Sequence, residues 1–300
     1  MNLLITGGTG FIGSKLCSRL LKDRHHLVVL SRHPETIKSP IHGIGSLDHL
    51  TNDIVFDAVI NLAGESIAEK RWSDQQKLRI LGSRVDTTQT LISYFTRIDH
   101  KPKVFISGSA IGYYGIGKTN EPIDETGSGD DSFCSQICQQ WEATALQAEP
   151  LGIRTCLLRT GIVIGSGGAL GKMLGPFKMG AGGKMGQGTQ WMSWIHIDDL
   201  IGIMLFCIEQ DSIQGPVNGT SPNPVTNQQF TKALGKVLNR PTFFTMPKVV
   251  IKLAMGQMGE ELLLAGKKIM PKKMLNAGYT FQYEDLEEAL SDMLKTNSYT

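Results

Sequence analysis

The chain has 300 residues, 41% of them hydrophobic, and its 30 Lys and Arg against 28 Asp and Glu give a net charge of +2. This composition is typical of a soluble globular protein, and the balanced charge argues against a nucleic-acid-binding or membrane-surface protein. Five scattered cysteines argue against a secreted disulfide framework, and neither a run of 18 apolar residues nor a signal-peptide pattern is visible. We therefore expect a cytoplasmic protein that acts on a small-molecule substrate, with no nucleic acid and no membrane as partner; a homo-oligomer is compatible with the sequence.

The first half of the chain alternates short apolar runs with helical patterns. The apolar runs predict buried strands, and the 3- and 4-residue spacing between them predicts helices. Such an alternation is typical of an α/β protein, so we expect a Rossmann-type doubly wound parallel sheet. The expected strands are 2–6, 26–31, 56–64, 103–110 and 154–165, and the expected helices are 11–22, 73–96 and 132–149.

The second half changes in character. A glycine-rich stretch from Gly165 to Gly188 predicts a loop with one short helix; a strand leading into a helix and a further capped helix follow. The tail from Met246 to about Leu294 predicts short helices broken by Pro271 and Gly278. We expect residues 1–165 to form the nucleotide-binding domain, to which later strand-helix segments can return. Residues 166–300 then form most of a smaller C-terminal substrate lobe, which includes a helical segment at 246–294.

The stretch "TGGTGFIG" places Gly7, Gly10 and Gly13 between the first strand and the first helix. Glycine permits a tight turn and a close approach of the backbone to a pyrophosphate, and the helix N-terminus supplies unpaired N–H groups. Strand, turn, helix and second strand all have the spacing of a dinucleotide-binding unit. We therefore expect the turn residues to bind a dinucleotide, namely Gly7, Thr9, Gly10, Phe11, Ile12 and Gly13.

The end of the second strand distinguishes between the two nicotinamide cofactors. An acidic residue there would bond the ribose 2′-hydroxyl of NAD, whereas this chain has Ser31 and Arg32. A hydroxyl and a guanidinium group can hold the 2′-phosphate of NADP through charge-assisted hydrogen bonds. The sequence therefore favours NADP, although an arginine on an exposed loop would look the same.

The spacing of "TGGTGFIG", "NLAGE", "SGSAIGYYG" and "WIHIDDL" resembles that of the extended short-chain dehydrogenase/reductases of the NAD-dependent epimerase/dehydratase superfamily. The stretches "WEATA" and "LLRTGIVIG" and the tail "GEELLLAGKKIMPKKMLNAGY" resemble its "epimerase family protein" branch, which has its own short C-terminal domain. This resemblance implies a Rossmann fold with NADP and a substrate lobe. It also implies cofactor contacts for Leu62, Ala63 and Ile162, and for Arg84, which could pair with the pyrophosphate or the 2′-phosphate.

Extended relatives transfer hydride with a serine and a Tyr-x-x-x-Lys pair, in which the lysine lowers the pKa of the tyrosine. The resemblance places the serine at Ser109 and the Tyr and Lys positions at Cys134 and Cys138, so both partners of the serine are missing. The chain offers Tyr114 as the favoured replacement proton donor. Other candidates are Tyr113, with Lys118 following, and Glu65, while His196 is expected to be a hydrogen-bonded structural histidine.

Cys134 and Cys138 belong to a predicted apolar stripe with Ile137, Trp141, Ala145 and Ala148, at 3- and 4-residue steps behind the helix-start residues Asp131 and Ser132. In such a stripe a free cysteine acts as a small hydrophobic residue. Two thiols at this spacing could bind a metal, but no adjacent Cys or His completes four ligands. We therefore expect core or site lining here and no metal.

Two functions follow from these patterns. The first is an NADP-dependent oxidoreductase or epimerase that acts on a hydroxyl or carbonyl group of a small polar substrate such as a nucleotide sugar, with Ser109 orienting the reacting oxygen. The second is an NADP-binding sensor or regulatory protein with little or no catalysis. The missing Tyr-Lys pair keeps this alternative open, because losing a general acid/base costs roughly 10²- to 10⁴-fold in rate without abolishing positioning.

Overall fold

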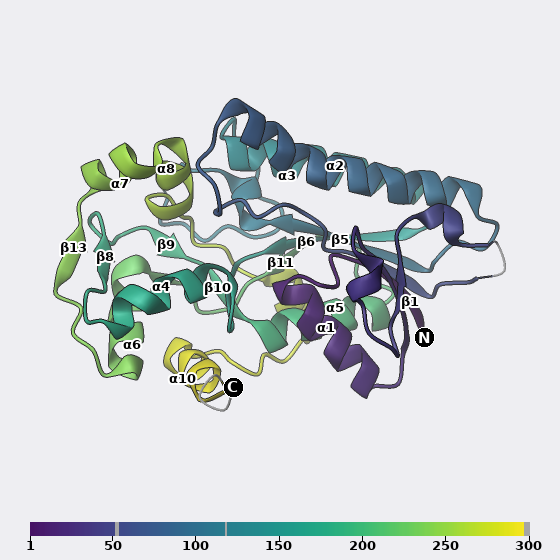
Figure 1. Cartoon of the computed structure of the whole chain (residues 1–300). Helices are drawn as coiled ribbons and strands as arrows, with labels where there is room; N and C mark the ends of the chain where they lie inside the picture. The colour runs from purple at the N-terminus through teal and green to yellow at the C-terminus, as the bar shows by residue number, and fades with distance from the viewer. Residues whose placement is uncertain (52–53, 118, 297–300) are drawn as a thin grey trace.

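The computed structural model describes residues 1–51, 54–117 and 119–296 (Figure 1). Its centre is a seven-stranded sheet in the order β11-β6-β5-β4-β1-β2-β3, with every neighbouring pair parallel. The strand order reverses between β1 and β4, which is the place where open α/β sheets bind nucleotides. The strands are β1 Asn2–Thr6, β2 His26–Leu30, β3 His42–Ile44, β4 Ala58–Asn61, β5 Val104–Ala110, β6 Arg154–Thr160 and β11 Gly215–Gly219.

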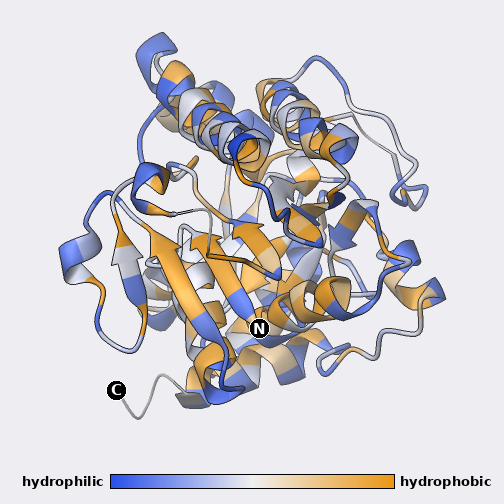
Figure 2. Ribbon diagram, turned by 90° about the vertical axis from the view of Figure 1, so that its right-hand side faces the viewer, coloured by the Kyte–Doolittle hydropathy of each residue, from blue (hydrophilic) through white to orange (hydrophobic). Residues whose placement is uncertain are grey.

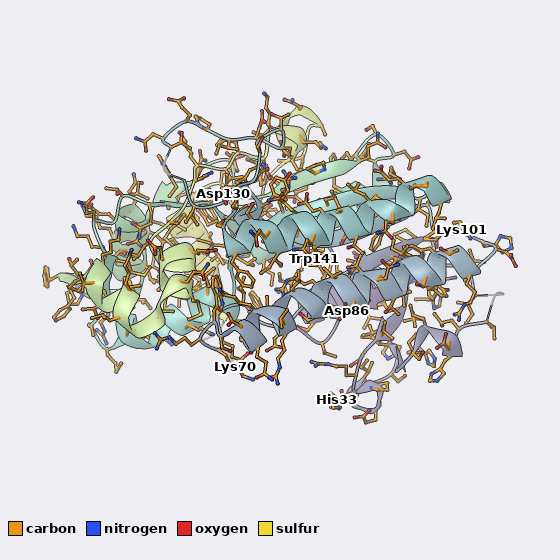
Figure 3. All side chains as sticks on the ribbon, turned by 90° about the horizontal axis from the view of Figure 1, so that it is seen from above. His33, Lys70, Asp86, Lys101, Asp130 and Trp141 are labelled. Atoms are coloured by element: carbon orange, nitrogen blue, oxygen red, sulfur yellow. The ribbon has the colours of Figure 1, made fainter. Side chains whose placement is uncertain are left out.

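Helices cover both faces of this sheet, as a doubly wound fold requires. One apolar core lies between the sheet and helices α1 (Phe11–Lys22) and α5 (Ile197–Glu209). A second core lies under α2 (Asp74–Arg97) and α3 (Phe133–Ala145), which run side by side above the sheet (Figures 1 and 3). The central strands are hydrophobic along their length because both of their faces are covered (Figure 2). The predicted fold class is confirmed.

The predicted helices begin and end close to the observed ones. Ser73 caps α2, its hydroxyl oxygen accepting a hydrogen bond from the amide of Gln76 at 3.2 Å. The helix expected over 132–149 is α3 followed by a 3₁₀ segment at Leu146–Leu151, since Pro150 cannot continue an α-helix. The other 3₁₀ segments are Pro34–Thr36, Leu47–His49 and Ile111–Tyr114.

The strand expected over residues 154–165 is two strands. β6 ends at Thr160 in the main sheet, whereas β7 (Ile162–Ile164) pairs with β10 (Trp194–His196) in a separate two-stranded sheet. Gly161 lies at the break, and a Cβ there would come within 2.5 Å of the Ser193 carbonyl oxygen. The chain therefore leaves the main sheet at a residue that only glycine fits.

The second lobe has its own apolar core, formed around Phe177, Trp194 and Phe230 and closed by the C-terminal helix. α5 and β11 come from beyond residue 165 but pack on or in the main sheet. None of the helices within the described ranges is both long enough and apolar enough to cross a membrane. The remaining elements are α4 Gly168–Lys178, β8 Gly183–Met185, β9 Trp191–Met192, β12 Val225–Thr226, α6 Asn227–Leu238, β13 Phe244–Met246, α7 Lys248–Met255, α8 Gln257–Leu263, α9 Lys272–Asn276 and α10 Leu286–Thr296.

Candidate cofactor and active site

Glycines shape the turn that joins β1 to α1. Gly7 has φ +69°, and a Cβ on it would lie 2.6 Å from the carbonyl carbon of Leu62. A Cβ on Gly13 would lie 2.2 Å from the carbonyl oxygen of Gly7. Gly10 closes the turn by donating its amide to the same oxygen at 3.0 Å. Side chains are therefore excluded at Gly7 and Gly13, and the backbone is open to a ligand.

Helix α1 begins directly after this turn. Its N-cap residue, Gly10, provides no side-chain acceptor for the amide groups of the first helical turn. Such groups, together with the helix dipole, favour an anion at this end of a helix. Thr9 and Gly10 are exposed, and Phe11 and Ile12 are half-buried, so the turn is accessible from solvent.

The ring of Phe11 lies against the start of the glycine-rich stretch. A Cβ on Gly165 or on Gly167 would come within 2.7 Å of that ring. The glycines therefore allow the chain that follows β7 to pass close to the phosphate turn. This contact joins the nucleotide-binding turn to the second lobe.

The end of β4 lies beside the same turn. Thr6 on β1 accepts the amide of Ala63 at 3.2 Å through its hydroxyl group, and donates to the side chain of Asn61 at 2.6 Å. Asn61 in turn donates to Thr88 on α2 at 2.8 Å. These buried bonds fix Leu62 and Ala63, both half-buried, next to Gly7, as the cofactor wall predicted for them requires.

Ser31 and Arg32 follow β2. The Ser31 amide donates to the Ile44 carbonyl oxygen at 2.9 Å, and the Ser31 hydroxyl oxygen accepts the amide of His33 at 3.1 Å. Arg32 is exposed. The two residues thus stand at the carboxyl end of β2, next to β1 in the sheet, where a 2′-phosphate would lie.

Arg84 reaches from α2 toward the carboxyl ends of β4 and β5. One guanidinium N–H donates to the Ile80 carbonyl oxygen at 2.9 Å, and the guanidinium carbon lies 5.3 Å from the centre of the Trp141 ring. A Cβ on Gly64 would lie 3.0 Å from that carbon. Burial lowers the pKa of Arg84. Because β1 separates β4 from β2, this position favours the pyrophosphate over the 2′-phosphate as the partner of Arg84.

Ser109 lies near the end of β5 and takes part in a buried ion-pair network. Its hydroxyl group donates to the Glu142 carboxylate at 2.6 Å. Arg159 on β6 donates to both oxygens of the same carboxylate at 2.8 Å. The three residues are only 5%, 5% and 2% exposed. A carboxylate only accepts hydrogen bonds, so the hydroxyl hydrogen of Ser109 points to Glu142. The oxygen of Ser109 can then accept a hydrogen bond from another hydroxyl group.

Tyr114 is held in the same network and is completely buried. Its hydroxyl group donates to Asn218 at 2.7 Å and accepts from Arg159 at 3.0 Å, and burial raises the pKa of Tyr114 to about 12. The Arg159 guanidinium carbon also lies 3.4 Å from the centre of the Tyr113 ring. These contacts argue against Tyr114 as the proton donor to a substrate, because its hydroxyl already has two protein partners. Lys118 lies outside the described residues.

Cys134 and Cys138 are free and buried, and the whole predicted stripe of α3 is buried with them. Burial, reinforced by the carboxylate of Glu261, raises the pKa of Cys134, and burial raises the pKa of Cys138 to about 11. Both thiols are therefore protonated at neutral pH. Glu261 on α8 also accepts the amides of Phe133 at 3.2 Å and Cys134 at 2.9 Å, so a residue of the C-terminal segment caps α3.

Ile162 and His196 lie where the two lobes meet. The amide of Ile162 donates to the Ser193 carbonyl oxygen at 2.9 Å. Nδ1 of His196 accepts the amide of Asp198 at 3.2 Å, which leaves the proton on Nε2, 3.5 Å from the Asp292 carboxylate. His196, Asp198 and Asp292 together offer ligand atoms within 4.8 Å, but this hydrogen bonding uses His196 as the cap of α5. Burial lowers the pKa of His196, in keeping with a neutral structural histidine.

Sequence reasoning missed three residues that shape this site: Glu142, Arg159 and Glu261. The Glu142–Arg159 pair had a signal in the chain, because a charged residue within an apolar helix stripe or an apolar strand is seldom buried without a partner. Glu261 had none, since it caps a helix that begins 128 residues earlier in the chain.

A parallel sheet with its order reversed at β1, a glycine turn into α1 and a serine at the end of β5 define a Rossmann-type nucleotide-binding protein of the extended short-chain dehydrogenase/reductase kind. The sequence matches the NAD dependent epimerase/dehydratase family over residues 3–218 and a domain of unknown function, DUF1731, over residues 246–293. The chain belongs to this epimerase family, as its motifs predicted.

Relatives of similar length share the whole chain. The epimerase family protein YfhF of Bacillus subtilis is 36% identical, with 98% of each chain covered. Human epimerase family protein SDR39U1 is 35% identical, with 98% of this chain and 100% of the human protein covered.

Solved structures agree. Human SDR39U1 (isoform 2), determined with NADPH, has a TM-score of 0.89 at 34% identity, covering 98% of this chain and 99% of the human one. A nucleoside-diphosphate sugar epimerase of Corynebacterium glutamicum has a TM-score of 0.78 at 29% identity, covering 98% of this chain and 58% of that one. The NADP predicted from Ser31 and Arg32 is thus the cofactor found in the human structure.

Proposed function

We propose that the protein is an NADP-dependent oxidoreductase or epimerase that acts on a hydroxyl or carbonyl group of a nucleotide sugar. The observation that carries this proposal is the shared carboxyl edge of the sheet. The glycine turn after β1, Ser31 and Arg32 after β2, and Ser109 on β5 all lie along this edge. The NADPH in the human relative supports the cofactor, and the name of the Corynebacterium relative supports the substrate class.

Most of these residues would bind the cofactor, whereas Ser109 would bind the substrate. The turn amides would hold the pyrophosphate, Arg32 the 2′-phosphate, and Arg84 a phosphate or ribose oxygen on the β4 side. NADP, when bound, supplies the hydride acceptor or donor. Ser109 orients the reacting oxygen of the substrate by accepting a hydrogen bond from it, since its own proton is given to Glu142.

Glu142 offers a route for the proton that the missing tyrosine would have taken. When a substrate hydroxyl group is oxidised, its proton passes to Ser109 Oγ while the Ser109 proton passes to the Glu142 carboxylate, 2.6 Å away. The reverse transfer protonates the oxygen when a carbonyl group is reduced. Arg159 keeps the carboxylate in place through two bonds of 2.8 Å and is a positioning residue for this step.

Label transfer tests the enzymatic function. The protein is incubated with NADPH deuterated stereospecifically at C4 and with a panel of nucleotide sugars, keto sugars and simple carbonyl compounds, and the products are followed by mass spectrometry. We expect deuterium in one product class, lost in Ser109→Ala and reduced about 10²-fold or more in Glu142→Gln. The reference variant is Ser107→Ala, on the same strand. Transfer that is unchanged in Ser109→Ala would contradict the roles assigned here.

The second candidate is an NADP-binding sensor or regulatory protein. It is favoured by the Tyr and Lys positions of the family pattern, which are occupied by the buried, protonated thiols of Cys134 and Cys138. Tight binding of NADPH with no label transfer to any compound of the panel would support this second function. Absence of NADPH binding would contradict both functions.

A further inference from the structure

One end of the molecule exposes apolar side chains from three elements. β13 is the outer strand of a two-stranded ribbon with β8, and it forms the left end of the view in Figure 1, with α7 above it. The segment before β13 lies against the end of α4, since Arg240 donates to the Lys178 carbonyl oxygen at 2.8 Å. We call this surface the apolar tip; its members are Met179, Phe243, Phe244, Met246, Val249, Val250 and Leu253.

The side chains of the apolar tip are well exposed and lie on neighbouring elements. Phe243 is 89% exposed, Leu253 74% and Met179 78%. On α7 only Ile251 is buried, so the helix uses one residue to pack and presents Val249, Val250 and Leu253 to solvent. Contiguous exposed apolar side chains of this kind mark an interaction surface rather than a packing remnant.

The charges around the apolar tip are mainly positive. Two of its basic residues have acidic partners, since Lys252 pairs with Glu260 at 2.6 Å and Lys236 pairs with Glu287. Two of the segments that build this lobe, residues 166–197 and 212–259, contain no Asp or Glu. They contain eight basic residues, namely Lys172, Lys178, Lys184, Lys232, Lys236, Arg240, Lys248 and Lys252. The net charge of +2 hides this segregation, because the acidic residues are concentrated elsewhere in the chain.

The basic residues flank the apolar ones on α7. Lys248 and Lys252 are four residues apart and form a stripe beside that of Val249 and Leu253, also four apart. A lysine such as Lys248 can lay its stem along an apolar surface while its ammonium group reaches a phosphate. The ammonium group of Lys252 is bonded to the Glu260 carboxylate at 2.6 Å. Apolar and basic stripes side by side are typical of helices that lie in the interface of an anionic membrane.

We propose that the apolar tip binds the surface of an anionic lipid bilayer. The ribbon end with Phe243 and Phe244 and the exposed face of α7 enter the headgroup region, and the lysines contact lipid phosphates. A second copy of the chain fits less well, because a symmetric contact would bring two mainly basic surfaces face to face. The proposal departs from our expectation of no membrane partner, which rested on the balanced net charge and on the lack of an 18-residue apolar run, and it is independent of the proposed function.

Vesicle co-sedimentation tests this proposal. The full chain is mixed with vesicles of phosphatidylcholine containing about one third phosphatidylglycerol, at low salt and at about 0.5 M salt, where exposed charges are largely screened. We expect binding at low salt that weakens in high salt and on pure phosphatidylcholine. A Phe243→Ser/Phe244→Ser variant should bind about tenfold more weakly or worse, and Lys248→Glu about fivefold more weakly.

The matched control is Leu78→Ser, which removes an exposed leucine on α2, 69% exposed, outside the apolar tip. It should bind vesicles like the unaltered chain, and far-ultraviolet circular dichroism should show all variants folded. No binding to anionic vesicles at low salt would overturn the proposal, and so would an equal loss in Leu78→Ser. A dimer in sedimentation velocity that the double phenylalanine variant dissociates, without vesicle binding, would assign the apolar tip to a second copy instead.

Discussion

Removing Arg159 should destabilise the protein more than any surface change. The side chains of Arg159 and Glu142 are 3% and 6% exposed, and two hydrogen bonds of 2.8 Å join them. Taking away one partner of such a buried pair leaves an uncompensated charge and costs about 3–5 kcal/mol. Native domains have only about 5–15 kcal/mol in total, so Arg159→Met should lose about a fifth or more of the free energy of unfolding.

A double variant distinguishes the loss of the ion pair from the change in side-chain volume. Glu142→Leu should also cost about 3–5 kcal/mol, but Glu142→Leu/Arg159→Met removes both charges and should cost clearly less than the sum of the two single changes. Equilibrium unfolding in urea, followed by tryptophan fluorescence and circular dichroism, measures all three variants. A single variant that loses under about 1 kcal/mol, or losses that add up, would refute the argument that the pair is coupled and desolvated.

Three further outcomes follow from the site. Gly13→Ala should abolish NADPH binding measured by calorimetry, because the Cβ of the alanine would lie 2.2 Å from the Gly7 carbonyl oxygen. Binding equal to that of the unaltered chain would be inconsistent with the turn geometry. Arg32→Ala should weaken NADPH binding about tenfold or more while leaving NADH binding unchanged, as a lost charge-assisted hydrogen bond predicts; an equal loss for both cofactors would argue against a 2′-phosphate contact. Since burial raises the pKa of Cys17 and Cys138 to about 11, these thiols should resist iodoacetamide at pH 8 and react only in urea; labelling of the native chain, read by mass spectrometry, would contradict their burial.

The nucleotide-binding half could be predicted in detail because its signals are local. Each of these signals spans only a few neighbouring residues. They are the turn from Gly7 to Gly13, the apolar strands and the cap of α2. Short-range sterics and hydrophobic periodicity therefore predict them, although the close approach of Leu62 to Gly7 adds a long-range constraint. The burial of Cys134 and Cys138 also followed from helical spacing alone.

The substrate side was harder to predict because long-range contacts determine it. The position of Tyr114 after Ser109 suggested a proton donor, but its hydroxyl group is buried against Asn218, 104 residues further along the chain. The break between β6 and β7 at Gly161 depends on a close approach to Ser193. The apolar residues on both sides of Gly161 do not indicate that the strand ends there. The net charge of +2 was equally uninformative about the apolar tip, since a sum contains no information on where charges lie.

The C-terminal segment is hydrogen-bonded to the part of the nucleotide-binding domain that surrounds Ser109. Glu261 caps α3, Met270 accepts the side-chain amide of Asn218 at 2.9 Å, and the amide of Lys273 donates to Glu125 at 3.2 Å. Asn218 in turn holds Tyr114, which bonds Arg159, the partner of Glu142. Because these bonds run unbroken from the C-terminal segment to Ser109, we infer that the position of Ser109 depends on the docking of that segment. Ser109, the serine that we propose to orient the substrate, is thus held in place through this network by the domain that follows the Rossmann domain.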